Sequence, residues 1–94
     1  MTYLVIFVLN VATLEPVILK DCIEYHPKTE QTIEGYVKDM ERSGQVCEQS
    51  KGMESWTCTD NKSIITKLAL IKDREECRTL PREAADKMKK ILGR

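Results

Sequence analysis

The stretch YLVIFVL, residues 3–9, is apolar at every position and decides the fold class. In a β-strand, alternate side chains point to opposite faces of the sheet. Both the odd-numbered and the even-numbered positions are apolar here, so a strand over this stretch would need cover on both faces. We therefore predict a strand at residues 3–9 in the interior of a sheet.

The same stretch has about the length of a signal-peptide core. However, no basic residue precedes it, and NVATLE, residues 10–15, is a poor cleavage site. It is also too short to cross a bilayer, for which about 20 apolar residues are needed. We interpret it as a strand of the folded protein, and a cleaved leader is the alternative.

Residues 17–25 predict a second strand, paired antiparallel with the first. Asp21 interrupts its apolar row, which indicates a bulge or a strand end nearby. The residues expected to point inward are Val17, Leu19, Ile23 and Tyr25.

Residues 29–43 predict a helix, because they carry one apolar stripe at helical spacing. Pro27 or Thr29 could open the helix, and Gly44 could end it in the left-handed conformation. The stripe consists of Ile33, Tyr36, Val37 and Met40.

The stretch VCEQSKGMESWTCTD, residues 46–60, predicts a β-hairpin. Its dipeptide Gly52-Met53 fits a type II′ turn, which favours glycine at the first position, and a turn at Lys51-Gly52 with another register is the alternative. In that register Cys47 lies opposite Cys58, and both share a face with Trp56. Directly opposed Cα atoms lie about 4.5–5.5 Å apart, within the range of a disulfide bond.

Residues 64–71 suit either a strand or a helix, and we favour a strand. Asp73 is placed to cap a following helix, and Pro81 is expected to kink or restart it before an apolar stripe at 84–92. The element order is then β-β-α-β-β-(β)-α over a single domain, residues 1–94. We predict an α+β, two-layer fold, with a mainly antiparallel sheet of four to five strands packed by two helices.

Four cysteines in 94 residues are many for a cytosolic protein. In an oxidising compartment we would pair Cys47 with Cys58 and Cys22 with Cys77, although three pairings are possible and the sequence does not choose. In the cytosol the same residues would be reduced and would fill the core as small apolar side chains. The weak leader favours the cytoplasm over secretion or the periplasm.

Metal binding and catalysis have little support. Cys22 and His26 are the one compact pair of candidate ligands, and the chain has no Cys-x2-Cys spacing. A single histidine removes most histidine-based acid–base schemes, and no glycine-rich phosphate loop occurs. We predict no cofactor, no metal site and no enzymatic activity.

Charge is divided unevenly along a chain whose net charge is zero. Residues 61–94 carry ten bases and five acids, whereas acids are in excess before them. The ordinary interpretation is a solvated helix face with internal ion pairs. The alternative is a basic surface for an acidic partner. That surface would consist of Arg82, Lys87, Lys89, Lys90 and Arg94.

The functional hypothesis is a non-enzymatic protein-binding module, such as a small inhibitor or adaptor, whose partner is another protein. One alternative is a small exported or periplasmic protein stabilised by two disulfides. Another is a nucleic-acid-binding regulator that uses the basic C-terminal third. Interspersed acids and only five aromatic residues argue against nucleic acid, and we expect no membrane contact.

Overall fold

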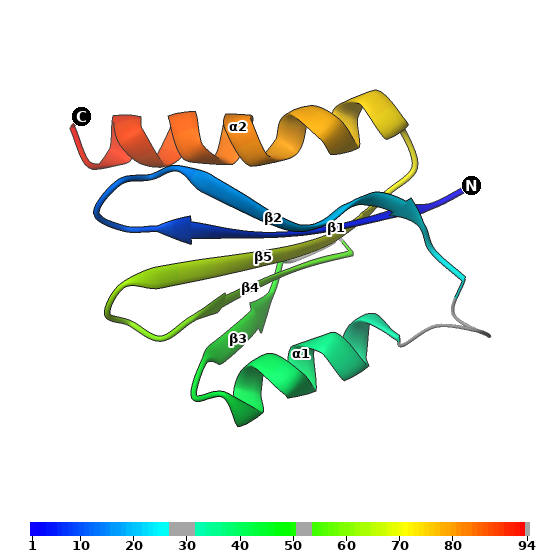
Figure 1. Ribbon diagram of the computed structural model, residues 1–94, viewed down its shortest axis with the longest axis horizontal. Helices are drawn as coiled ribbons and strands as arrows, with labels where there is room; N and C mark the ends of the chain where they lie inside the picture. The colour runs from blue at the N-terminus through cyan, green and yellow to red at the C-terminus, as the bar shows by residue number, and fades with distance from the viewer. Residues whose placement is uncertain (27–31, 51–53, 94) are drawn as a thin grey trace.

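The computed structural model describes residues 1–26, 32–50 and 54–93. Its five strands form one antiparallel sheet in the order β2-β1-β5-β4-β3, and two helices lie against it (Figure 1). The predicted α+β class and element order are confirmed. The elements are β1 (Tyr3–Asn10), β2 (Pro16–Glu24), α1 (Ile33–Arg42), β3 (Val46–Gln49), β4 (Ser55–Thr59), β5 (Ile64–Ile71) and α2 (Arg74–Ile91).

β1 lies inside the sheet between β2 and β5, as its sequence predicts. Leu4, Val5, Ile6 and Phe7 are each at most 2% exposed. Val5 and Phe7 belong to the apolar cluster that includes α2, and Leu4 and Ile6 belong to the cluster that includes α1. The strand therefore has a core on each of its two faces.

The two helices cover opposite faces of the sheet. α2 packs mainly over β2 and β1, and α1 packs over β3 and β4 on the other face. The structure thus differs in one detail from the predicted two-layer arrangement, because the layers run helix, sheet, helix. The physical reason is β1, whose apolar side chains on both faces each need cover.

α1 begins at Ile33, later than the sequence predicts, and the expected start at residues 27–29 lies outside the described residues. Thr32 is the N-cap, and its Oγ1 accepts a hydrogen bond from the Gly35 N–H at 3.1 Å. The Tyr25 hydroxyl accepts another from the Ile33 N–H at 2.9 Å. Gly44 follows the helix with φ of 97°, the left-handed conformation that its sequence position predicts.

β2 is an edge strand with two register shifts against β1. One shift lies where Cys22 has φ of 50°, which confirms the predicted irregularity beside Asp21. The predicted inward row is wrong in its first half, because Val17 and Leu19 are 58% and 52% exposed. α1 covers the opposite edge of the sheet and does not reach this part of β2.

The hairpin has the predicted register. Cys47 pairs with Cys58 and Gln49 with Trp56. Both cysteines and Trp56 lie in the cluster beneath α1, so the predicted shared face is confirmed. The expected turn at residues 52–53 lies outside the described residues.

α2 is one continuous helix of 18 residues with Pro81 inside it, so the predicted restart of the helix at this proline is wrong. Asp73 caps the helix as predicted, and its side chain accepts from the N–H groups of Glu75 and Glu76. Proline removes one backbone hydrogen bond from a helix. Burial of Pro81 with Cys77 and Ala85 against the sheet holds the helix together across that gap.

Asp60 organises the turn between β4 and β5. Its Oδ1 accepts hydrogen bonds from the N–H groups of Lys62 and Ser63 at 2.9 Å and of Ile64 at 3.1 Å. Because these donors favour the charged carboxylate, they hold the pKa of Asp60 well below its usual range.

We expect the stability of the Asp60→Asn variant to depend less on pH in the acidic range than that of the wild type. The folded-state pKa lies below the unfolded value of about 3.9, so the carboxylate stabilises the fold fully above that value. This stabilisation is lost as the pH falls from there towards the folded-state pKa. Melting temperatures measured from about pH 6 to about pH 2 should show the wild-type advantage shrinking below about pH 4. An advantage that stays constant with pH would contradict this role, and Glu34→Gln on α1 is the control.

Candidate functional site: a groove beside α2

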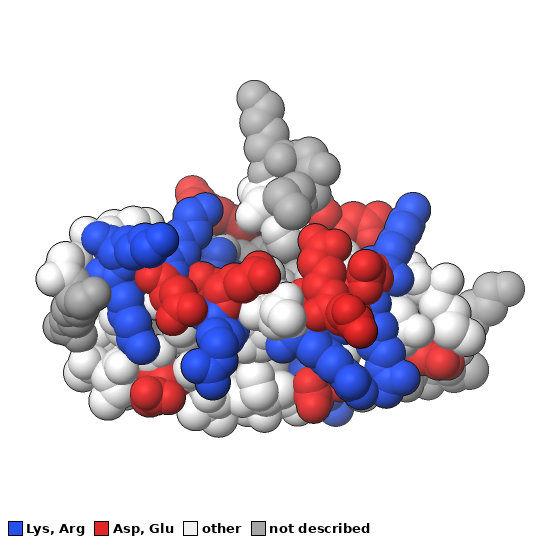
Figure 2. All heavy atoms as spheres, turned by 90° about the horizontal axis from the view of Figure 1, so that it is seen from above, with Lys and Arg blue, Asp and Glu red and all other residues white. Residues whose placement is uncertain are grey.

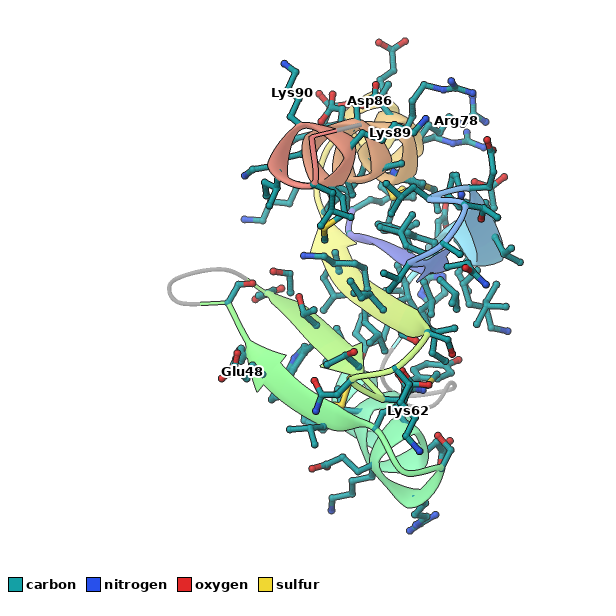
Figure 3. All side chains as sticks on the ribbon, turned by 90° about the vertical axis from the view of Figure 1, so that its left-hand side faces the viewer. Glu48, Lys62, Arg78, Asp86, Lys89 and Lys90 are labelled. Carbon is teal, nitrogen blue, oxygen red and sulfur yellow. A yellow bond between two sulfur atoms is a disulfide. The ribbon has the colours of Figure 1, made fainter. Side chains whose placement is uncertain are left out.

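A groove runs along the side of α2 that faces the hairpin. It forms because α2 packs mainly over β2 and β1, which leaves part of β5 and β4 open on this face of the sheet. Its volume is about 480 Å³, and Ser50, Glu54 and Ser55 lie across from the helix. Figure 3 looks along α2, with the helix and the hairpin on either side of β5.

One stripe of α2 lines the groove. Its members recur every three or four positions, which places them on one face of the helix. Ala69 and Ile71 of β5 add apolar surface to the floor. An apolar lining with a few charged groups is the usual composition of a binding site. The stripe consists of Glu76, Leu80, Glu83, Ala84, Lys87, Met88 and Ile91.

Lys67 is a charged residue on the otherwise largely apolar floor of the groove. It is half-buried on β5, between its directly opposed neighbours Phe7 on β1 and Thr57 on β4. Burial is the main cause that lowers the pKa of Lys67, and the nearby charge of Lys87 adds to it. Neither lysine forms an ion pair with any residue that the structure describes. Two ammonium groups therefore share this part of the groove, and no carboxylate of the described ranges is paired with either of them.

Carboxylates line the other end of the groove. Glu76 lies in the first turn of α2, and Glu54 adjoins the end of β5, where its carbonyl oxygen accepts from the Leu70 N–H at 2.9 Å. Glu83 also lines the groove, but it lies one helical turn before Lys87 and therefore not at the acidic end. α2 runs back along the sheet after β5 (Figure 1). The groove is therefore acidic near the end of β5, where Glu54 and Glu76 lie, and basic near Lys67 and Lys87.

The surface that the sequence predicts to be basic carries both positive and negative charges. Arg82, Lys87 and Lys90 are exposed on α2, Lys89 is partly buried, and Arg94 lies outside the described residues. Figure 2, which views the α2 side, shows acidic side chains interspersed among the basic ones. Figure 3 shows Asp86 on the same helix as Lys89 and Lys90. Of the four described members of the predicted set, Lys87 is the one that lines the groove.

Sequence reasoning missed the special position of Lys67. The signal was present in residues 64–71, because Ile65, Lys67, Ala69 and Ile71 share one face of the strand. A single lysine in an otherwise apolar row indicates either an exposed end of the face or a site for a counter-charge. The sequence does not show that α2 lies over β2 and β1 and leaves this part of β5 uncovered. The groove exists because of that position of the helix.

The structure joins all four cysteines in disulfides, so no described cysteine is free. Cys22 of β2 is bonded to Cys77 of α2, with Cα atoms 5.9 Å apart, and Cys47 is bonded to Cys58 across the hairpin. These are the pairs that we considered for an oxidising compartment. The alternative of reduced cysteines filling the core is not what the structure holds.

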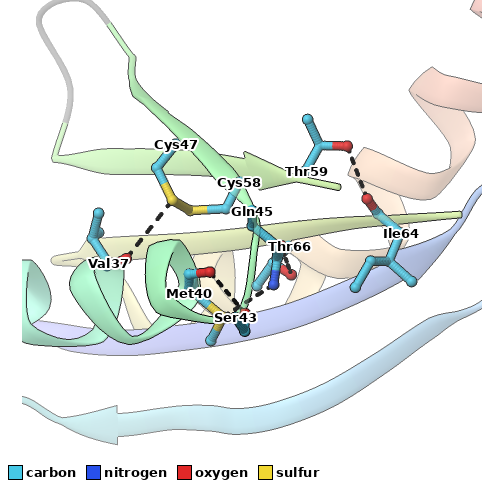
Figure 4. The surroundings of a disulfide bond; sticks show 9 residues. All are labelled: Val37, Met40, Ser43, Gln45, Cys47, Cys58, Thr59, Ile64 and Thr66. Carbon is cyan, nitrogen blue, oxygen red and sulfur yellow. Dashed lines mark hydrogen bonds between the residues drawn. A yellow bond between two sulfur atoms is a disulfide. The ribbon is translucent and has the colours of Figure 1, made fainter. Parts of the chain in front are cut away.

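Each disulfide lies in a different core of the molecule. Cys22–Cys77 belongs to the cluster between the sheet and α2, and Cys47–Cys58 to the cluster between the sheet and α1. Figure 4 shows the hairpin disulfide beside α1, with the Val37 carbonyl oxygen 3.9 Å from Cys47 Sγ. The first bridge ties α2, and with it one wall of the groove, to the edge strand β2.

Metal binding finds no candidate among the described residues, where no three His, Cys, Asp or Glu side chains gather in one place. Within the same described ranges, neither helix has the length and apolar character needed to cross a bilayer.

Compared with known proteins, the chain matches no family model, no curated protein and no solved structure.

Proposed function

We propose that the protein is a non-enzymatic protein-binding module, such as a small inhibitor or adaptor, and that the groove beside α2 receives its partner. The observation that supports this proposal is the pairing of an apolar lining with two lysines that lack an ion-pair partner among the described residues. A half-buried charge of this kind costs stability in the free protein. Such a cost is typical of a site whose counter-charge arrives with a ligand.

The size of the groove suits a protein segment. Interfaces are organised around a few anchor side chains that enter pockets, with a charged rim that sets orientation. Leu80, Ala84 and Met88 provide the apolar wall of such a pocket, and Lys87 stands at its rim. The outer face of α2 carries charges of both signs, which would add specificity more than affinity (Figure 2).

Charge reversal on α2 tests this function. We expect Lys87→Glu with Lys89→Glu and Lys90→Glu to abolish capture of the partner from the native host, while the melting temperature changes little because none of the three is fully buried. Affinity capture with mass spectrometry identifies the partner, and binding to that purified partner then gives the affinity of each variant.

The matched control applies the same change of charge elsewhere. The control variant exchanges three lysines that do not line the groove, one on β2, one on α1 and one in the β4–β5 turn. The substitutions are Lys20→Glu, Lys38→Glu and Lys62→Glu. This control should keep the partner. Binding that survives the α2 triple variant would remove α2 from the interface, and a basic partner would point instead to the acidic segment 26–60. Capture of nucleic acid with steep salt dependence would favour a nucleic-acid-binding regulator.

A second candidate function is a small exported or periplasmic protein stabilised by two disulfides, and the presence of both bonds favours it. Disulfides form and persist in oxidising compartments. The two candidates are compatible, because a binding module can act outside the cytosol. Alkylation of the protein taken directly from its native compartment tests this candidate: it predicts no free thiols, and four free thiols would contradict it.

A further inference from the structure

We propose that the groove binds an apolar segment of the partner protein that carries one carboxylate, and that this carboxylate lies between the ammonium groups of Lys67 and Lys87. This inference rests on the proposed function, because it names the chemistry of the segment that the groove receives. The carboxylate comes from an aspartate, a glutamate or the C-terminus of the partner chain.

Charge complementarity identifies the anion. Lys67 and Lys87 both line the groove, and neither is paired with a described carboxylate. Two neighbouring ammonium groups repel each other, and a carboxylate between them replaces that repulsion with two charge-assisted hydrogen bonds. Half-burial of Lys67 strengthens the interaction, because the attraction is larger where water is partly excluded.

The rest of the lining restricts the segment to one carboxylate with apolar neighbours. Between Lys87 and Glu76, α2 lines the groove with the apolar side chains of Leu80 and Ala84 and with one carboxylate, Glu83, which would also repel a second acid. At the far end, Glu54 and Glu76 would repel a second carboxylate. The groove therefore accepts an acid at the Lys67 end and disfavours one at the other end, which gives the bound segment a defined direction.

A small apolar acid tests the site without the partner. The probe is 4-phenylbutyrate, followed by NMR shifts of the backbone amides, with 4-phenylbutanamide and 4-phenylbutylamine as controls of the same shape. For about 12 non-hydrogen atoms we expect a Kd of about 1 mM for the acid. We expect binding about tenfold weaker for the amide and no groove binding for the amine, because each changes only the charged end.

Three variants assign the effect to Lys67. Lys67→Met keeps the length of the side chain and removes its charge, so affinity for the acid should fall about tenfold. Its melting temperature should not fall, because the change also removes a half-buried charge and the repulsion from Lys87. Lys67→Arg keeps the charge and should keep most of the affinity. Lys62→Met, in the exposed β4–β5 turn, should change nothing.

The outcomes separate this inference from the proposed function. Any of three results would overturn the proposed carboxylate site, even if the α2 triple variant loses its partner. These are equal affinity for the acid and the amide, NMR shifts that map outside the groove, and unchanged binding of the acid by Lys67→Met. Acid-selective binding in the groove that depends on Lys67 supports the site. If the captured partner is nevertheless indifferent to Lys67→Met, the proposed docking of the partner in this groove is wrong while the anion site itself stands.

Discussion

Val37→Asp is expected to unfold the domain. Val37 is 4% exposed and packs with Ile33, Leu4 and Ile6 between α1 and the sheet. An aspartate there would be a buried charge without a partner, and we expect a loss of more than about 4 kcal/mol. Domains are stable by only about 5–15 kcal/mol, so a loss of this size is enough to unfold a domain at the lower end of that range. Urea denaturation followed by circular dichroism measures the effect.

The control for this variant lies on the same helix. Glu34 is exposed on the solvent side of α1, so Glu34→Ala should leave the denaturation midpoint almost unchanged. Similar losses in the two variants would mean that α1 docks through a different face from the one that the structure shows.

Removal of the Cys22–Cys77 bond should produce the other large loss of stability. A disulfide stabilises by restricting the unfolded chain, and the effect grows with the length of the loop that it closes. The bond between Cys22 and Cys77 spans 55 residues, whereas that between Cys47 and Cys58 spans 11. We expect a loss of about 4 kcal/mol for Cys22→Ala with Cys77→Ala, and of about 3 kcal/mol for the hairpin pair.

The measurement is urea denaturation of both double variants under oxidising conditions. Each variant also serves as the other's control, because each exchanges two cysteines for two alanines. Reductant should lower the wild-type midpoint and leave a variant without either bond unaffected. A wild type insensitive to reductant would show that the bonds do not form in solution, and a larger loss for the hairpin pair would contradict the loop-length explanation.

The sequence was most informative where a pattern has one structural solution. Residues 3–9 are apolar on both faces, and that property alone predicts an interior strand. The opposition of Cys47 and Cys58 followed from the prediction of a turn at Gly52-Met53, because a turn sets the position of every later pair. Both predictions agree with the structure.

The predictions that were wrong concern residues whose burial or conformation depends on the elements packed against them. Val17 and Leu19 have the spacing of buried residues, but they lie at a sheet edge that α1 does not cover. Pro81 has the local preference of a helix breaker, but packing of α2 against the sheet outweighs that preference. In both cases tertiary packing decides, and the local sequence does not contain it.

The candidate site was predictable only in part. The basic character of α2 is visible in the sequence, and Lys87 proved to be a groove residue. The groove itself depends on which strands α2 covers, and no periodicity reports the lateral position of a helix on a sheet. Lys67 gains its importance from that position, so it could be singled out only once the helix was placed.

The claim that the partner docks in the groove can be tested most directly by photo-crosslinking from methionine. Photo-methionine is nearly isosteric with methionine, and replacing all four methionines places a reactive group at Met88 in the groove, while Met53 lies outside the described residues. Two others provide internal controls, because Met1 is 83% exposed and Met40 packs against the core beneath α1. Irradiation with the purified partner, followed by peptide mapping, should give crosslinks at Met88 and few at Met1. Crosslinks at the exposed Met1 with none at Met88 would contradict docking in the groove.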